Sequence, residues 1–230
     1  REIQEDDTGA VQKKNGTLLV LADGMGRAFG GRISSRLAVS AFLELFQEQS
    51  AFERPQYYFR RAFAAANQRI LEELDDQRGG ASVAAALITE NRLFYALAGN
   101  VKVAVFRDGD LISVSEGHTI GVLAQQQFRA GRITREEALQ ILEKKRLYNY
   151  VGQDGFHDIE YFSEPITLQT GDLVVLLSDG VYECLKWRDI EDILRVEAEA
   201  QDMALNIIEK VNDSPKEHKD NASVVLLRIS

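Results

Sequence analysis

The pattern of apolar and polar residues predicts strands joined by hairpins, interrupted by amphipathic helices. Strands are expected where short apolar runs are bounded by turn residues, and helices where apolar residues recur every three or four positions. The expected strands cover residues 17–22, 83–88, 93–98, 101–106, 111–114, 159–162, the vicinity of 166, 173–178 and 222–229. The expected helices cover residues 32–49, 55–74, 188–196 and 200–211, and the polar stretch 120–150 also has helical character.

Three turn signals lie between these strands: Asn15-Gly16, Glu90-Asn91 and Asp108-Gly109. Asn-Gly is the strongest short-range signal for a two-residue hairpin loop. If it forms the loop, Thr8 lies opposite Asp23 in the paired strands. Glu5 and Asp6 then fall at the same end of the hairpin as Asp23, so the register gathers acids from separate segments.

Many hairpins separated by two consecutive long helices favour an α+β fold: two packed antiparallel β-sheets flanked by helices, in an α-β-β-α sandwich. The helical stretch near 120–150 reads as an insertion between sheet strands. We expect one domain over residues 1–230, since this length does not require two. The chain starts at Arg1 without methionine, which is consistent with a missing upstream segment.

The composition of the chain argues against several kinds of partner and location. The net charge of −9 argues against a nucleic-acid partner, because phosphate contacts require clustered Lys and Arg. Apolar stretches are too short to span a bilayer, so no membrane association is expected. Cys184 stands alone, which excludes an intrachain disulfide and fits a cytoplasmic location.

Candidate chemistry lies where acids meet the ends of apolar runs: Asp23-Gly24, Asp179-Gly180 and Asp220-Asn221. Taken singly, each pair is more typical of a turn. If the strands ending at Asp179 and beginning after Asp220 are antiparallel neighbours, both acids lie at one edge of the sheet. Carboxylates gathered in this way repel each other unless cations neutralise them, which predicts a two-metal centre for hard divalent ions. Such a centre suits phosphoryl transfer, and the Arg1 guanidinium would bind phosphate oxygens in bidentate fashion.

The order of the motifs resembles the type 2C metal-dependent Ser/Thr protein phosphatases, over essentially the whole chain. The motifs that carry the resemblance are Arg1-Glu2-Ile3-Gln4-Glu5-Asp6, Leu21-Ala22-Asp23-Gly24-Met25-Gly26, Ser178-Asp179-Gly180-Val181 and Asp220-Asn221-Ala222-Ser223-Val224. Residues 130–138 resemble the flap of bacterial members, which implies a flap subdomain at about residues 118–152. Each motif is weak alone, but five in the right order make the assignment specific.

The resemblance implies hydrolysis of phosphoserine and phosphothreonine in proteins by a water activated between two Mn²⁺ or Mg²⁺ ions. In that scheme Asp23 bridges the ions, the Gly24 carbonyl binds one of them, and Asp179 and Asp220 complete the shell of the other. A phosphorylated protein would be the substrate and a cognate Ser/Thr kinase pathway its source, with the enzyme acting as a monomer.

Three further roles follow from the resemblance. Glu5 and Asp6 would hold waters at the ions, with Glu5 acting closer to its ion. Arg1 would bind the substrate phosphate. Met25 stands where eukaryotic relatives have a His as general acid, so a water at the metal site would have to protonate the leaving oxygen.

Two departures from the family pattern stand beside this core. Asn100 replaces an acid that usually binds a third ion, and we expect that ion to bind poorly or not at all, with Asn100 offering only a carbonyl oxygen. Gly117 replaces another acid. These changes keep an alternative open, namely a catalytically weak or silent regulatory module with the phosphatase fold.

Overall fold

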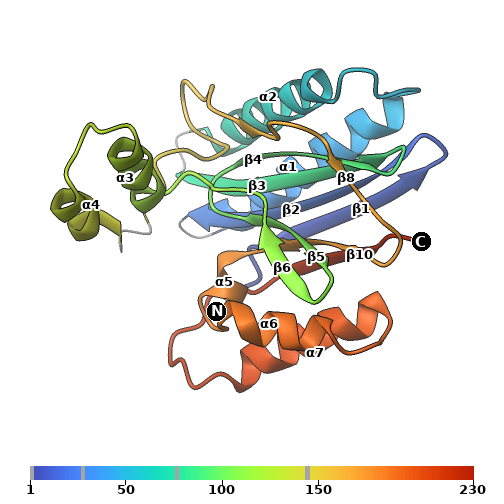
Figure 1. Ribbon diagram of the computed structural model, residues 1–230. Coiled ribbons are helices and arrows are strands. Elements are labelled where there is room, and N and C mark those ends of the chain that lie inside the picture. The colour runs from blue at the N-terminus through green and yellow to red at the C-terminus, as the bar shows by residue number, and fades with distance from the viewer. Residues whose placement is uncertain (1–2, 27–28, 76–77, 143–145) are drawn as a thin grey trace.

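The computed structural model describes residues 3–26, 29–75, 78–142 and 146–230, and these form an α-β-β-α sandwich, as the sequence predicts (Figure 1). Within those ranges, none of the helices combines the length and the apolar character that crossing a membrane requires. The elements in chain order are β1 (Asp7–Lys13), β2 (Gly16–Gly26), α1 (Gly30–Glu48), α2 (Pro55–Leu74), β3 (Gly79–Thr89), β4 (Arg92–Ala98), β5 (Lys102–Arg107), β6 (Asp110–Ser113), α3 (Ile120–Arg129), α4 (Arg135–Leu142), β7 (Glu160–Tyr161), β8 (Ile166–Thr167), β9 (Leu173–Leu177), α5 (Asp179–Tyr182), α6 (Trp187–Leu194), α7 (Ala200–Asp213) and β10 (Val224–Arg228).

Two antiparallel sheets form the middle layers. The first has the strand order β1-β2-β3-β4-β7, with β8 also paired to β4, and the second has the order β10-β9-β5-β6. Helices α1 and α2 pack on the outer face of the first sheet, while α6 and α7 cover the second (Figure 1). The core therefore has three apolar interfaces, one between the sheets and one beneath each helix layer.

The sequence of the central strand β9 does not alternate between apolar and polar residues, because both faces of the strand are covered. Val174 and Leu176 point into the core between the two sheets, while Leu173, Val175 and Leu177 pack beneath α6 and α7. Because side chains alternate between faces, a strand covered on both sides must be apolar at every position. All five residues are buried.

Two of the three predicted hairpin loops are confirmed. Glu90-Asn91 and Asp108-Gly109 each form a two-residue loop with positive φ at both positions. Such φ values are those of the turn type that matches the twist of paired strands. Local turn preferences therefore account for these two connections.

The predicted register of the first hairpin is wrong by two residues. Lys13 pairs with Gly16, so the loop is Lys14-Asn15 and Thr8 lies opposite Leu21. Asn15 does not adopt the positive φ that an Asn-Gly loop needs, and Gly16 instead joins β2. A shift of two residues keeps every side chain on its predicted face. The Asp23 end of the hairpin therefore remains the end at which Glu5 and Asp6 lie.

The insertion contains two short helices, α3 and α4, that pack on one another and project from the side of the sandwich (Figure 1). A capping box begins α4: the Glu137 backbone donates to Thr134 Oγ1 at 3.2 Å, and the Thr134 backbone donates to Glu137 Oε2 at 2.8 Å. The two stems of this flap meet at a bridge between Thr119 and Leu147.

Candidate metal centre

The acidic motifs meet at one end of the sandwich. Val224 pairs with Leu177, so the segment after β9 and the segment before β10 lie at the same edge of the second sheet, as predicted. Their backbones touch: a Cβ placed at Gly180 would lie 1.9 Å from the Asn221 carbonyl oxygen. Glycine after Asp179 is thus required by the close approach of the two motifs.

Gly24 marks a second close approach. A Cβ at this position would lie 2.2 Å from the Gly31 carbonyl oxygen and 2.4 Å from the Glu5 carbonyl oxygen. The Glu5 backbone also donates to Asn221 Oδ1 at 3.0 Å. Main-chain contacts therefore hold together the segment before β1, the end of β2 and the start of α1, and the Asn221 side chain joins the segment before β10 to them.

Four carboxyl groups in this region influence one another. The pKa of Asp6 is raised to about 6, chiefly by burial and in smaller part by the carboxylates of Asp179 and Asp220. Burial and then the negative charges of Asp179, Asp6 and Asp220 raise the pKa of Asp23 well above its usual range. The pKa of Asp179 is raised chiefly by burial as well. No three acids in the described residues form a ready-made ligand set, but the negative charges of Asp179 and Asp220 are close enough to oppose the ionisation of Asp6 and Asp23.

The environment of the Asp6 carboxylate indicates whether cations fit this group of acids. Its side chain is buried, and neither carboxylate oxygen has a hydrogen-bond partner of acceptable geometry. The hydroxyls of Ser178 and Ser223 lie near enough to lower its pKa somewhat, against the larger effect of burial. A buried carboxylate left without donors is costly, and a divalent cation removes that cost. The residues present therefore fit a group of hard cations.

The structure separates the two neighbouring acids of the first motif. Asp6 interacts electrostatically with Asp179 and Asp220, whereas the Glu5 carboxylate lies against Gly31 at the start of α1. Glu5 is nonetheless buried, with 7% of its surface exposed. Arg1 lies outside the described residues, so its predicted contact with phosphate stays a prediction.

Asn100 has a contact that the sequence analysis missed. Its Nδ2 donates to Asp179 Oδ2 at 3.0 Å, while its Oδ1 accepts the Ser82 hydroxyl at 2.7 Å. The side-chain oxygen of Asn100, which was expected to be available to an ion, accepts the Ser82 hydroxyl, and its role toward an ion stays a prediction. A signal was available: the confirmed Glu90-Asn91 loop sets a β3–β4 register that brings Ser82 opposite Gly99, beside Asn100.

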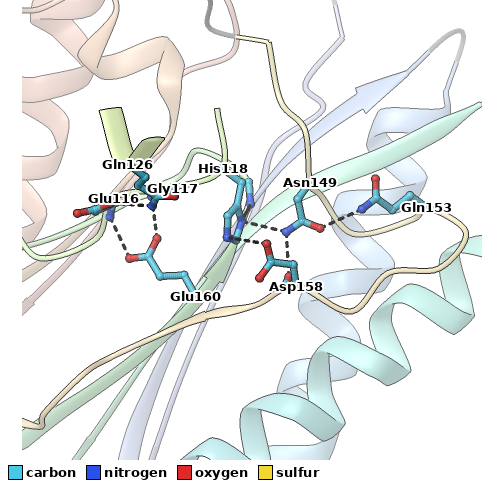
Figure 2. Close-up of polar contacts among 9 residues, drawn as sticks. Glu116, Gly117, His118, Gln126, Asn149, Gln153, Asp158 and Glu160 are labelled. Atoms are coloured by element: carbon cyan, nitrogen blue, oxygen red, sulfur yellow. Dashed lines mark hydrogen bonds and ion pairs between the residues drawn. The ribbon is translucent and has the colours of Figure 1, made fainter. Parts of the chain in front are cut away.

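The base of the flap adjoins this corner. Gly117 has φ +90°, and its N–H donates to Glu160 Oε2 at 2.7 Å, while the Glu116 N–H donates to the other oxygen at 2.9 Å (Figure 2). Glycine at 117 thus serves a left-handed turn that a carboxylate from β7 holds in place.

The family model described as protein phosphatase 2C matches residues 2–210. The chain belongs to the protein phosphatase 2C family. This family is metal dependent, which agrees with the carboxylates gathered around Asp23.

Individual relatives align along nearly the whole chain. The serine/threonine phosphatase stp of Listeria welshimeri is 27% identical, over 99% of this chain and 90% of its own length. The protein phosphatase PhpP of Streptococcus pneumoniae is 24% identical, over 96% and 89%.

Solved structures of phosphatases share the fold. The serine/threonine phosphatase of S. agalactiae superposes with a TM-score of 0.86 at 24% identity, covering 100% of this chain and 95% of that one. The catalytic domain of the phosphatase PstP, solved in complex with two manganese ions, has a TM-score of 0.74 at 26% identity, covering 98% and 91%. This protein phosphatase 2C chain therefore has the architecture of its bacterial counterparts.

Proposed function

We propose that the protein is a metal-dependent serine/threonine phosphatase that hydrolyses phosphoserine and phosphothreonine in phosphoproteins. The observation that carries the proposal is the buried carboxylate of Asp6, whose oxygens make no hydrogen bond of acceptable geometry and which lies near the negative charges of Asp179 and Asp220. Membership of the protein phosphatase 2C family and the named phosphatases among its relatives support the same activity. The alternative of a silent regulatory module is not favoured.

The proposed ligands divide into two groups around Asp23, which would bridge two ions. Asp179 and Asp220 would hold one ion with Asp6 near it, and the Gly24 carbonyl with Glu5 would serve the other. Two bound Mn²⁺ or Mg²⁺ ions would neutralise phosphate charge and make water a stronger nucleophile near neutral pH. Arg1 would orient the phosphate through paired N–H groups.

Asn100 limits the number of ions in this scheme. Its side-chain nitrogen already satisfies one oxygen of Asp179, and its side-chain oxygen is engaged by Ser82. A neutral donor at this position removes the charge that a third ion would need. We therefore assign two ions to the protein and expect a third to bind poorly.

We also propose a single catalytic domain over residues 1–230 with a flap at about 118–152. The continuous apolar core that joins α1, α2 and both sheets supports one folding unit. A cognate kinase as the source of substrate, a monomeric state and a cytoplasmic location are proposed from family resemblance and from the lone cysteine.

The activity is tested with p-nitrophenyl phosphate and a phosphothreonine peptide, each assayed with Mn²⁺, with Mg²⁺ and with EDTA. Hydrolysis that requires the ion and disappears in Asp23→Asn would support the proposal. A folded wild-type protein that binds Mn²⁺ but hydrolyses neither substrate would instead establish the silent module.

A further inference from the structure

His118 lies where the flap joins the sandwich. It directly precedes Thr119, the residue that caps α3, and its carbonyl oxygen accepts the Tyr148 N–H at 3.1 Å from the returning stem. His118 therefore lies beside the Thr119–Leu147 bridge at which the two stems of the flap meet. The His118 side chain is buried, with only 5% of the residue exposed.

The hydrogen bonds of the His118 ring fix its protonation. Nδ1 lies 3.1 Å from the Gly99 backbone nitrogen and 3.0 Å from Asn149 Nδ2 (Figure 2). The backbone nitrogen of Gly99 can only donate, so Nδ1 must accept, and the ring proton lies on Nε2. Burial lowers the pKa of His118, which keeps the ring in this neutral form.

Asn149 extends the contact to the segment after the flap. Its Nδ2 also donates to the Asp158 carbonyl oxygen at 2.9 Å, and its Oδ1 accepts Gln153 Nε2 at 2.9 Å. The carboxylate of Asp158 lies 4.0 Å from His118 Nε2. The imidazole is thus held between the flap stems, the segment 149–158 and the end of β4.

His118 makes hydrogen bonds to both the N–H and the carbonyl group of Gly99. The His118 backbone donates to the Gly99 carbonyl oxygen at 2.6 Å, in addition to the bond from the Gly99 N–H to the ring. Gly99 has φ +117°, and a Cβ there would lie 2.2 Å from Ser82 Oγ, so this turn has little freedom to move. The position of Asn100, the next residue, is therefore set in part by His118.

Asn100 carries this constraint to the metal centre. All four of its polar groups are engaged: its side chain bonds Asp179 and Ser82, its N–H donates to Ser82 Oγ at 3.2 Å, and its carbonyl accepts the Tyr182 hydroxyl at 2.7 Å. A shift of the Gly99–Asn100 turn would therefore change the bond from Asn100 to Asp179, because it would move the Asn100 amide relative to that carboxylate.

We infer that His118 is a positioning residue that couples the base of the flap to the metal ligand Asp179 through Gly99 and Asn100. The inference rests on the proposed role of Asp179 at the metal centre. Partners that orient a metal ligand commonly change metal affinity by about 10–100-fold when replaced. His118 acts on Asp179 only through Gly99 and Asn100, and we expect a change at the low end of that range.

Two substitutions by amide residues distinguish a positioning role of His118 from a role in packing alone. In His118→Asn the side-chain oxygen can stand at the position of Nδ1 and accept the Gly99 N–H, whereas His118→Gln places its polar atoms beyond that position. Mn²⁺ binding is measured by titration calorimetry on the full chain, and flap opening by hydrogen exchange. We expect His118→Gln to lose about 10-fold in Mn²⁺ affinity and to exchange faster at residues 98–101 and 117–120. We expect His118→Asn to stay within about 3-fold of the wild type.

A double-mutant cycle tests the path. In the Asn100→Ala background, His118→Gln should cause little further loss of Mn²⁺ affinity, because the link to Asp179 is already cut. Additive losses, or equal affinities for the Asn and Gln variants, would overturn the inference. If His118→Gln does not fold, the wild type alone decides: Mg²⁺ binding should slow exchange at 98–101 and 117–120, and unchanged exchange there would contradict the coupling. A wild type that binds no Mn²⁺ would overturn the proposed function together with this inference.

Discussion

The side-chain nitrogen of Asn100 donates a hydrogen bond to Asp179 Oδ2 at 3.0 Å, within a group of carboxylates that otherwise repel one another. This contact lowers the pKa of Asp179, although burial keeps it raised overall. The neutral Asn100 amide thus stabilises the negative charge of Asp179, whereas an acid at position 100 would add to the repulsion among the carboxylates.

Replacing Asn100 by Asp should reverse that effect. The new carboxylate would face Asp179 without a donor between them, so we expect the metal-free protein to lose roughly 1–3 kcal/mol of stability at neutral pH. We also expect an additional Mn²⁺ to bind, visible as a higher stoichiometry in titration calorimetry. Asn100→Ala is the matched control, since it removes the donor without adding a charge. Unchanged stoichiometry, rate and metal dependence in Asn100→Asp would refute the assignment of two ions.

Asp23→Asn should move activity and stability in opposite directions. Removing the carboxylate that we propose bridges the two ions should lower metal-dependent hydrolysis of p-nitrophenyl phosphate by at least about 100-fold, or roughly 2.7 kcal/mol in barrier. The same change removes one of four mutually repelling acids, so the metal-free protein should unfold at a higher urea concentration. Asp108→Asn is a suitable control because Asp108 belongs to an Asp-Gly pair in a hairpin loop. It should leave the hydrolysis rate and the stability unchanged.

Asp6 predicts how the stability of the metal-free protein varies with pH. Its pKa rises from 3.8 to about 6 in the folded state, so folding favours the protonated carboxyl. Stability should therefore fall as pH rises between about 4 and 6, by on the order of 2–3 kcal/mol from this group. Urea unfolding in EDTA at several pH values measures it, and Asp6→Asn should flatten the slope. Asp110→Asn, at an exposed position on β6, is the control and should leave the slope of stability against pH unchanged. An equal slope in the wild type and Asp6→Asn would show that Asp6 is not the source.

The ion pair between Arg107 and Asp172 should matter more than other pairs in the fold. Asp172 is buried, accepts both Arg107 Nε at 2.9 Å and Nη2 at 2.5 Å, and also accepts the Gln169 N–H. We expect Asp172→Ala to cost roughly 2–4 kcal/mol. Because hydrogen bonding to Arg107 holds the pKa of Asp172 below its usual range, the contribution should be present at neutral pH and fade as acid protonates the carboxylate.

The exposed pair Arg69–Glu44 is the comparison for Asp172. Solvent screens its charges, so Glu44→Ala should cost less than about 1 kcal/mol. Chemical denaturation of the two variants side by side measures the difference. Equal losses would mean that burial does not strengthen the Arg107–Asp172 pair.

The chain itself determined most of the elements and their class. Periodicity placed α2 at its observed bounds, and two turn signals fixed the loops at Glu90-Asn91 and Asp108-Gly109. These features depend on interactions between residues close in sequence, which local patterns record. The apolar runs before Asp179 and after Asp220 likewise indicated strands, and the pairing of β9 with β10 then brings their acids to one edge.

Packing between distant segments decided the rest. Asn15-Gly16 is a strong local signal, yet pairing along the whole of β1 and β2 set a different loop and moved the register by two residues. The orientation of the Asn100 amide depends on Ser82 and Asp179, which lie 18 and 79 residues away along the chain. Sequence therefore supplied the acids and the strand ends, whereas only the tertiary structure set which atom of Asn100 faces Asp179 and tied the flap to it through His118. The reason is physical: backbone preferences act over a few residues, while hydrogen-bond partners buried in a core are chosen when separate elements pack.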